Sequence, residues 1–395
     1  MIYDTSLDSL LQKVWDGARI HLEEALRLYR LPLEELGALA DRRRQLSRAD
    51  AHGGRGNEIV TFIVDRNINY TNVCNVYCKF CAFYRTEKDA DSYVISHEEI
   101  DRKIAETVVL GGTQILMQGG HHPKLTKQWY LDLLGHIREK FPQVNVHGFS
   151  PSEIVAFSGF FNEPVEQVLK DFVAAGLGSL PGGGGEILVD RVRNRIAPLK
   201  ANTADWMGVM DTAHRLGLAS TATMMFGHVE TVEDRIEHLE VVRAQQDVSL
   251  ARLSAAISAP SSPLERSAAF ARALELGEIN GGAFTAFIAW TFQPDNAVLK
   301  APTVGAHEYL RTQALSRIYL DNIPSVQSSW VTQGPEIGQI ALKYGANDLG
   351  SIMIEENVVS AAGTTFRMGV ADMQRLIRDL GCEPRQRDNW YRLVN

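Results

Sequence analysis

The sequence predicts an α/β fold, specifically a (β/α)8 TIM-type barrel with an N-terminal helical cap and a C-terminal extension. Two observations lead to this prediction. From residue 57 onward, short apolar runs alternate with amphipathic stretches that are long enough for crossover helices. The apolar runs number eight, which is the strand count of a closed barrel of this type. Functional groups are then expected on the loops that follow the strand carboxyl ends.

Residues 1–56 form the predicted cap, because leucines recur there at helical spacing on both sides of Pro32. Residues 57–354 form the predicted barrel. Its predicted strands are residues 59–65, 114–118, 144–149, 178–181, 219–226, 284–290, 324–331 and 349–354. The helices expected between them are residues 97–110, 126–141, 163–175, 203–216, 231–246, 305–321 and 333–345.

Two segments fall outside this alternation. Residues 247–281 are predicted to be an insertion, with a turn at SAPSSP followed by a short amphipathic helix. Because the insertion precedes a strand, we expect it at the end of the barrel away from the active face, as surface decoration. Residues 355–395 form the predicted C-terminal extension, in which a helix is followed by the polar EPRQRD and packs across one barrel end.

Composition excludes several classes of function. The chain has 395 residues with 40 Lys and Arg against 48 Asp and Glu, so its formal net charge of −8 disfavours a general nucleic-acid binder. A hydrophobic content of 45% predicts a folded globular protein. The first residues lack the pattern of a secretory signal, and no apolar run is long enough to span a bilayer. We therefore expect a cytoplasmic protein with neither nucleic acid nor membrane as a partner.

The cysteines are distributed unevenly. Cys74, Cys78 and Cys81 form a C-x3-C-x2-C spacing directly after the first predicted strand, whereas Cys382 lies far away and is expected to be an inert thiol. Three thiolates cannot complete a four-coordinate zinc site alone, but on a four-iron cubane they leave one iron open to a small molecule. Core thiols, or a zinc site that borrows a distant histidine, are the alternatives.

With the aromatic Phe80 before the last cysteine, this segment resembles the cysteine motif of the radical S-adenosylmethionine (SAM) enzymes. The resemblance implies a barrel fold and one 4Fe-4S cluster per chain, held by the three cysteines. It also implies S-adenosyl-L-methionine as a cofactor, which is cleaved reductively to methionine and a 5′-deoxyadenosyl radical that abstracts hydrogen from carbon. An electron donor such as flavodoxin or ferredoxin is then an expected partner.

By the same resemblance, two glycine-rich segments are candidate cofactor sites. Gln118, Gly119 and Gly120 end the second strand, where related enzymes bind the methionine amino group of SAM. Many of those enzymes have Glu after the two glycines, where this chain has His. The run GGGGE ends in Glu186, a candidate ligand of the SAM ribose, and Arg193 is a candidate ligand of the methionine carboxylate. For the Gly119-Gly120 pair, the structural alternative is a simple turn. For the GGGGE run and Arg193, it is a mobile loop followed by a solvent-exposed helix.

The later strand ends carry further polar side chains. His228 and Glu230 follow the fifth predicted strand, and we expect either to act as an acid or a base toward the substrate. The candidate substrate-binding residues are His121, His122, Trp290, Gln293 and Ser328.

From about residue 58 to the C-terminus, segments such as QILMQGGHHP, TATMMFGHVET and FTAFIAWTFQPDN resemble more narrowly the radical SAM enzymes of the futalosine route to menaquinone. This resemblance implies a nucleoside-like small-molecule substrate, dehypoxanthine futalosine. It is cyclised by hydrogen abstraction at C4′ of the ribose and attack of the sugar radical on the benzoate ring. The insertion at 247–281 departs from that pattern.

Three alternatives remain open. Aminofutalosine synthase joins two substrates by a different radical step. Another radical SAM enzyme of the deazaflavin-synthase type is also compatible with the cysteine loop. An iron–sulfur electron carrier or sensor is the non-enzymatic alternative, although carriers generally supply four ligands to the cluster.

Overall fold

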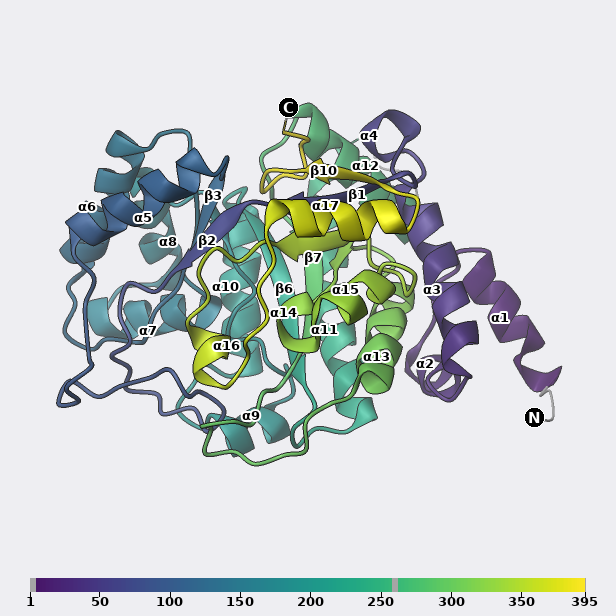
Figure 1. Ribbon diagram of the computed structural model, residues 1–395, viewed down its shortest axis with the longest axis horizontal. Helices are drawn as coiled ribbons and strands as arrows, with labels where there is room; N and C mark the ends of the chain where they lie inside the picture. The colour runs from purple at the N-terminus through teal and green to yellow at the C-terminus, as the bar shows by residue number, and fades with distance from the viewer. Residues whose placement is uncertain (1–4, 258–261, 395) are drawn as a thin grey trace.

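The strands of the computed structural model surround one interior, and helices cover the outside (Figure 1). The structure describes residues 5–257 and 262–394. Within these ranges the sheet has the order β10-β1-β9-β8-β7-β6-β5-β4-β3-β2, and its strands pair in parallel. The strands are β1 (Ile59–Ile63), β2 (Asp65–Ile68), β3 (Gln114–Met117), β4 (Asn145–Gly148), β5 (Ser179–Leu180), β6 (Ala219–Phe226), β7 (Phe284–Thr291), β8 (Ser325–Gln327), β9 (Asp348–Ser351) and β10 (Glu383–Gln386).

The sheet curls until its two ends share one segment of chain. Strands β1 and β2 are two halves of that segment, interrupted at Val64. On one side, the Val64 carbonyl accepts a hydrogen bond from Thr113 N at 3.3 Å. On the other side, Ile63 O accepts from Ile352 N at 3.1 Å. Because this segment has a neighbour on each side, the eight predicted strand positions enclose one interior, and the predicted barrel class is confirmed.

The helices between the strands begin at capping residues that the sequence supplies. Ser96 caps α5 by accepting from Glu99 N at 3.3 Å, and Thr231 caps α11 by accepting from Asp234 N, also at 3.3 Å. The helices around the barrel are α5 (His97–Val109), α6 (Lys127–Lys140), α7 (Pro151–Phe161), α8 (Val165–Ala175), α9 (Asp190–Ile196), α10 (Thr203–Arg215), α11 (Val232–Leu253), α13 (Ala306–Tyr319), α14 (Trp330–Gln333) and α15 (Pro335–Ala341).

Two local predictions about these elements were wrong, and α7 was missed. Helix α7 was not predicted, although Ser150 and Glu153 form a capping box at its start. The predicted strand at 324–331 stops at Gln327, because the chain turns there and Trp330 begins α14 with its indole donating to Ser351 O at 3.0 Å. Helix α11 does not end at Gln246 but continues to Leu253, into the predicted insertion.

The rest of the predicted insertion contains α12 (Pro263–Leu276), and residues 258–261 of its predicted turn lie outside the described residues. Ser262 caps this helix, accepting from Glu265 N at 3.2 Å. Helix α12 packs against α3, α4 and α11. This position is beside the amino ends of the strands, since Gly282, just before β7, donates to Leu218 O just before β6.

From residue 5, where the described chain starts, to the barrel, four α-helices lie on one side of it (Figure 1). They are α1 (Asp8–Trp15), α2 (Leu22–Leu28), α3 (Leu33–Arg48) and α4 (Ala51–Gly54). Arg19, between α1 and α2, is held by the carboxylates of Asp247 at 2.6 Å and Asp321 at 2.7 Å. The helices therefore pack on α11 and α13 through charged as well as apolar contacts.

The end of the chain forms two short helices, α16 (Val358–Ala361) and α17 (Val370–Asp379), followed by β10. Strand β10 pairs in parallel with β1 as an edge strand, which the sequence analysis missed because EPRQ has no apolar alternation. After β10, the Arg387 guanidinium reaches Asp348 of β9 at 2.5 Å. None of the described helices is both long and apolar enough to cross a bilayer.

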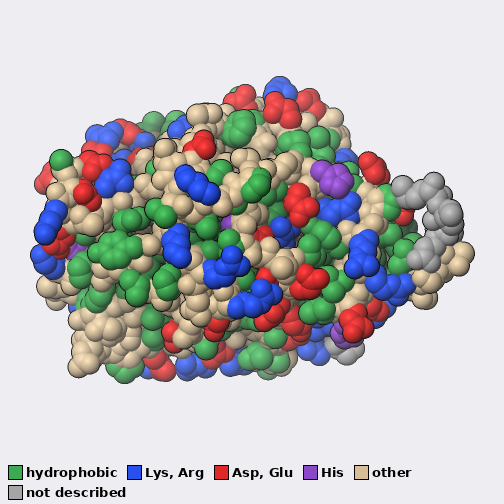
Figure 2. All heavy atoms as spheres, turned by 90° about the horizontal axis from the view of Figure 1, so that it is seen from below, with side chains coloured by type: hydrophobic (Ala, Val, Ile, Leu, Met, Phe, Trp, Pro, Cys, Tyr) green, Lys and Arg blue, Asp and Glu red, His purple; other side chains and the backbone are tan. Residues whose placement is uncertain are grey.

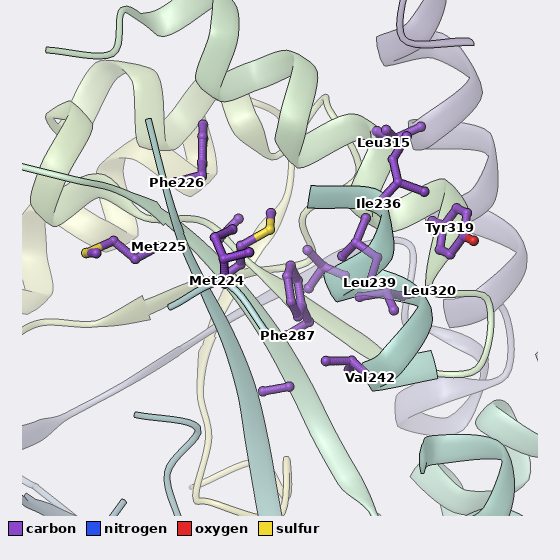
Figure 3. Packing of buried hydrophobic residues seen from close by; sticks show 14 of the residues in the cluster. Met224, Met225, Phe226, Ile236, Leu239, Val242, Phe287, Leu315, Tyr319 and Leu320 are labelled. Atoms are coloured by element: carbon purple, nitrogen blue, oxygen red, sulfur yellow. The ribbon is translucent and has the colours of Figure 1, made fainter. Parts of the chain in front are cut away.

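The largest apolar core lies between the barrel wall and its outer helices. In Figure 3, Phe287 of β7 and Met224 of β6 lie beside Leu239 and Val242 of α11. All four side chains are buried, and burial of a side chain of this size contributes about 1.5–3 kcal/mol. This packing holds β6 and β7 in place and with them the loops at their carboxyl ends.

Candidate active site

A cavity of about 300 Å³ lies inside the barrel. This volume is at the lower end of the range for small-molecule sites. Its walls are inward-facing side chains of the strands together with the glycine loop after β5 and parts of the C-terminal segment. Polar residues of the wall include Asp65, Gln118, His147, Glu186, Thr223 and Gln327.

The three clustered cysteines lie on the loop after β2, at the carboxyl edge of the barrel, as predicted. Backbone bonds tie this loop to distant segments. Cys74 N donates to Arg85 O at 3.0 Å, Lys79 N donates to Ile196 O at 2.9 Å, and Lys79 O accepts from Leu299 N at 2.7 Å. The loop is therefore held by α9 on one side and by the segment after β7 on the other.

Burial dominates the electrostatics of the thiols. Burial raises the pKa of Cys78 to about 12, and burial also raises the pKa of Cys81. Cys74 adds to both shifts and the nearby ammonium of Lys200 opposes them, so the three thiols and this lysine lie within electrostatic reach of one another. Among the described residues, no three His, Cys, Asp or Glu side chains converge on one metal ion. A four-iron cluster would bind each cysteine through a different iron, so the three thiols need not converge on one point.

The Gly119-Gly120 pair fits closely against the cysteine loop. A Cβ at Gly120 would lie 2.2 Å from Val73 O and 3.0 Å from the Cβ of Cys74. A Cβ at Gly119 would lie 2.6 Å from the Tyr70 ring. Glycine is required at both positions, since no side chain fits in these spaces. The pair therefore sets the distance between β3 and the cysteines.

The second glycine run forms one wall of the cavity. A Cβ at Gly183 would lie 2.1 Å from Nε2 of Gln118, and a Cβ at Gly182 would lie 2.6 Å from Thr221 O. Glu186 follows with a positive φ of 33° and is buried at the cavity edge. The run lies against the backbone of β6 and the Gln118 side chain after β3, and it directs the Glu186 carboxylate toward the cysteine side of the site.

Lys200 is the main residue that the sequence analysis missed. Its Nζ lies 2.9 Å from Glu186 Oε1 and 5.3 Å from the centre of the Phe80 ring. Although burial opposes it, the Glu186 carboxylate raises the pKa of Lys200 to about 12. Lys200 belongs to a coil between α9 and α10 that carries no motif, so only its tertiary position indicates a role.

Arg193 is buried on α9, but its hydrogen bonds go to the backbone. It donates to the carbonyls of Gly184 at 3.1 Å, Gly185 at 2.7 Å and Ala201 at 2.5 Å, and it lies 3.7 Å from Glu186. The guanidinium therefore holds the glycine run and the Lys200 coil together. It is not among the residues that line the cavity.

His228 and Glu230 are also absent from the cavity wall. Glu230 accepts from Gly227 N at 2.6 Å and pairs with Arg235 at 2.9 Å, while His228 Nδ1 accepts from Val229 N at 2.7 Å. Burial opposes ionisation of Glu230, but His228 and Arg235 lower its pKa. These contacts make the pair a support for the loop after β6.

The structure places the predicted substrate residues in three different positions. Trp290 and Ser328 line the cavity. His121 and His122 lie beside the cysteine loop, where the His121 carbonyl accepts from Asn75 N at 3.3 Å, and burial lowers the pKa of His121 to about 3. Gln293 turns back on its own strand and donates to Thr291 O at 3.1 Å.

Comparison with known proteins agrees with this geometry. The chain matches the family model of the Radical SAM superfamily over residues 68–242 and that of the CofH/MqnC C-terminal region over residues 281–395. Among solved structures, the FeFe-hydrogenase maturase HydG from Carboxydothermus hydrogenoformans superposes with a TM-score of 0.65 at 15% identity, covering 98% of this chain and 81% of that one. The barrel and its cysteine loop therefore define a radical SAM enzyme.

Three curated relatives narrow this class. The cyclic dehypoxanthine futalosine synthase of Halalkalibacterium halodurans is 41% identical over 98% of this chain and 95% of its own, and that of Streptomyces coelicolor is 42% identical over 99% and 90%. The aminodeoxyfutalosine synthase of Thermus thermophilus is 34% identical over 100% and 97%. The chain belongs to the family of the cyclic dehypoxanthine futalosine synthases.

Proposed function

We propose that this protein converts dehypoxanthine futalosine into its cyclic form, using a 4Fe-4S cluster and SAM. The observation that carries the proposal is the difference in identity between its relatives. Two cyclic dehypoxanthine futalosine synthases from different organisms are 41% and 42% identical to this chain, against 34% for an aminodeoxyfutalosine synthase that it matches over an equal length.

Cys74, Cys78 and Cys81 would hold the cluster, and the carboxyl edge of the barrel fits this group because three thiols share one anchored loop there. Gln118, Gly119 and Gly120 would receive SAM on the β3 side, and Glu186 its ribose. With both groups bound, the site is supplied with a hydrogen-abstracting adenosyl radical. Since Arg193 is committed to backbone carbonyls, we assign the methionine carboxylate of SAM to the Lys200 ammonium instead.

The remaining residues of the cavity would bind and orient the substrate. Ile288 and Trp290 of β7 form an apolar wall on which an aryl ring can pack, and Gln327 and Ser328 offer hydrogen bonds. An enclosed interior also keeps water away from a reactive carbon radical. The chain's contribution is then chiefly to hold the sugar and the aryl group in contact.

The test is anaerobic turnover of the reconstituted protein with SAM, a reductant and dehypoxanthine futalosine. Mass spectrometry is expected to detect 5′-deoxyadenosine and a product lighter than the substrate by two hydrogen atoms. Both should disappear in Cys78→Ala and persist in Cys382→Ala, whose cysteine lies beside α17, outside the cysteine loop. Formation of deoxyadenosine that does not depend on the substrate would contradict the proposed substrate.

We further propose that a small acidic one-electron protein of the flavodoxin or ferredoxin kind docks beside the cysteine loop. Lys and Arg side chains gather near the middle of the face shown in Figure 2, although the whole chain is acidic. Around the cysteine loop, exposed Lys79, Arg195 and Lys300 form no ion pair with the described part of the chain. Exposed apolar side chains lie among them: Tyr77, Leu199 and Val298.

Charge reversal tests this surface. We expect Arg195→Glu and Lys300→Glu to slow turnover driven by reduced flavodoxin by about 10-fold, with a weaker dependence on salt than wild type. Turnover driven by dithionite should not change, because that small reductant needs no docking surface. Lys343→Glu after α15 is the charge-matched control. Equal slowing with both reductants would contradict the docking role.

A further inference from the structure

A chain of polar side chains runs along the inside of the barrel across β2, β3, β4 and β5. Gln114 Nε2 donates to Asp65 Oδ2 at 3.0 Å, and Asn145 Nδ2 donates to Gln114 Oε1 at 3.1 Å. The same Asn145 nitrogen donates to Ser179 Oγ at 3.0 Å. Ser179 Oγ in turn lies 2.7 Å from Nδ1 of His147. Each of these hydrogen bonds joins neighbouring strands, so the strand order of the sheet brings the polar side chains into one row.

The hydrogen bonds along this row of polar side chains have a fixed donor-to-acceptor direction, which is set by Asp65. Burial raises the pKa of Asp65, and hydrogen bonds from Ser351 and Gln114 oppose that shift. As a carboxylate Asp65 only accepts, so Gln114 turns its NH2 group toward it and its carbonyl toward Asn145. Asn145 must then use its own NH2 group for both of its bonds. Ser179 receives one of these bonds and has its single hydrogen left for His147. Nδ1 of His147 is therefore an acceptor, and the ring proton lies on Nε2.

Nε2 of His147 has no hydrogen-bond partner among the described residues, and the residue lines the cavity. His214 offers a useful contrast. It is equally buried, but its two ring nitrogens are bound by Ser249 at 2.7 Å and Ser220 at 2.6 Å. Burial lowers the pKa of both histidines to about 3. His147 is thus a neutral donor fixed in orientation, and His214 is a structural residue of the same type.

We propose that His147 donates its Nε2 hydrogen to an uncharged oxygen of the substrate, a sugar hydroxyl, in the cavity. This inference rests on the proposed function for the identity of the substrate. The charges nearby favour a neutral acceptor. Asp65 lines the same cavity, and the guanidinium of Arg387 is already paired with Asp348 at 2.5 Å and 3.1 Å. A substrate carboxylate would face Asp65 without a free cation, whereas a hydroxyl accepts from His147 at no such cost.

Two substitutions at position 147 distinguish the role of Nε2 from that of Nδ1. Glutamine places an N–H near the position of Nε2, whereas asparagine reaches only as far as Nδ1 and leaves the cavity without the donor. The reconstituted enzyme is titrated calorimetrically with dehypoxanthine futalosine in the presence of SAM and without reductant. We expect His147→Asn to weaken binding by about 10-fold to 100-fold and His147→Gln by less than about 3-fold. In turnover, KM should rise in His147→Asn while kcat changes little.

His214→Asn is the matched control, and it should bind the substrate like wild type. Equal binding by the two position-147 variants, whether wild-type or weakened, overturns the inference. If either variant fails to fold, Ser179→Ala replaces it, because freeing Nδ1 allows the proton to leave Nε2. Binding should then weaken by about 5-fold, and unchanged binding overturns the inference. Failure of wild type to bind or convert the substrate would instead overturn the proposed function.

Discussion

Lys200 Nζ lies 2.9 Å from Glu186 Oε1, although the two residues belong to separate coils on either side of α9. Both side chains are largely buried, and Lys200 also faces the ring of Phe80 within the cysteine loop. This pair joins the glycine run to the cluster loop. It places a cation and an anion together where SAM is expected to bind.

Replacement of Lys200 should therefore affect the fold and cofactor binding together. Lys200→Met leaves Glu186 buried with only the more distant Arg193 at 3.7 Å, and we expect a loss of about 2–3 kcal/mol in unfolding free energy. SAM should bind about 10-fold more weakly by equilibrium dialysis, and Lys200→Arg should recover part of this loss. Wild-type SAM affinity in folded Lys200→Met would contradict the carboxylate assignment.

The close approach of Gly120 to the cysteine loop predicts a strong effect of one methyl group. In Gly120→Ala the new Cβ meets the Val73 carbonyl at 2.2 Å, so the cysteine loop must move. We expect less iron per chain after reconstitution and a lower melting temperature. Gly208→Ala on α10 is the control, since no atom lies within 4 Å of its Cβ and the change should stabilise the helix by about 0.5–1 kcal/mol. Equal iron contents in the two variants would disprove this prediction.

Glu230 is expected to support the fold rather than the chemistry. Glu230→Gln removes the carboxylate that Arg235 faces at 2.9 Å, and we expect a loss of about 2 kcal/mol in unfolding free energy. The folded fraction should keep a kcat close to that of wild type. A kcat that falls by about 100-fold at unchanged stability would instead support the acid–base role predicted from sequence.

Because several histidines are buried, we expect the free energy of unfolding to fall in acid. Burial lowers the pKa of His147, His214 and His238 to about 3 each, below the ordinary value of 6.5. Between these values the unfolded chain binds more protons than the native one, so unfolding free energy decreases as the pH falls from about 6.5. Each histidine contributes up to about 1.4 kcal/mol per pH unit.

Urea unfolding at about pH 7 and about pH 5 measures this dependence. His214→Gln should be less stable at neutral pH but show a shallower loss on acidification, by roughly one proton. An unchanged slope in that variant would mean that His214 titrates normally in the native state.

Much of the fold could be predicted from local patterns in the sequence. Apolar runs and the stretches between them located the eight barrel strands and most outer helices, because burial on both faces of a parallel strand requires continuous apolar sequence. Strand β10 was missed because it pairs at an edge and its EPRQ sequence has no such pattern. Helix α7 was missed although Ser150 and Glu153 form a capping box at its start.

The sequence by itself determined the class of the barrel, the position of the cysteine loop and the two glycine runs that pack beside it, because these depend on residues close together in the chain. The tertiary structure decided how the polar residues are used. Arg193 donates to backbone carbonyls and Glu230 pairs with Arg235. Lys200 and His147 have no motif, yet Lys200 pairs with Glu186 beside the cysteine loop and His147 lines the cavity. A buried polar group must find a partner, and which partner it finds depends on strands and coils that only the folded chain brings together.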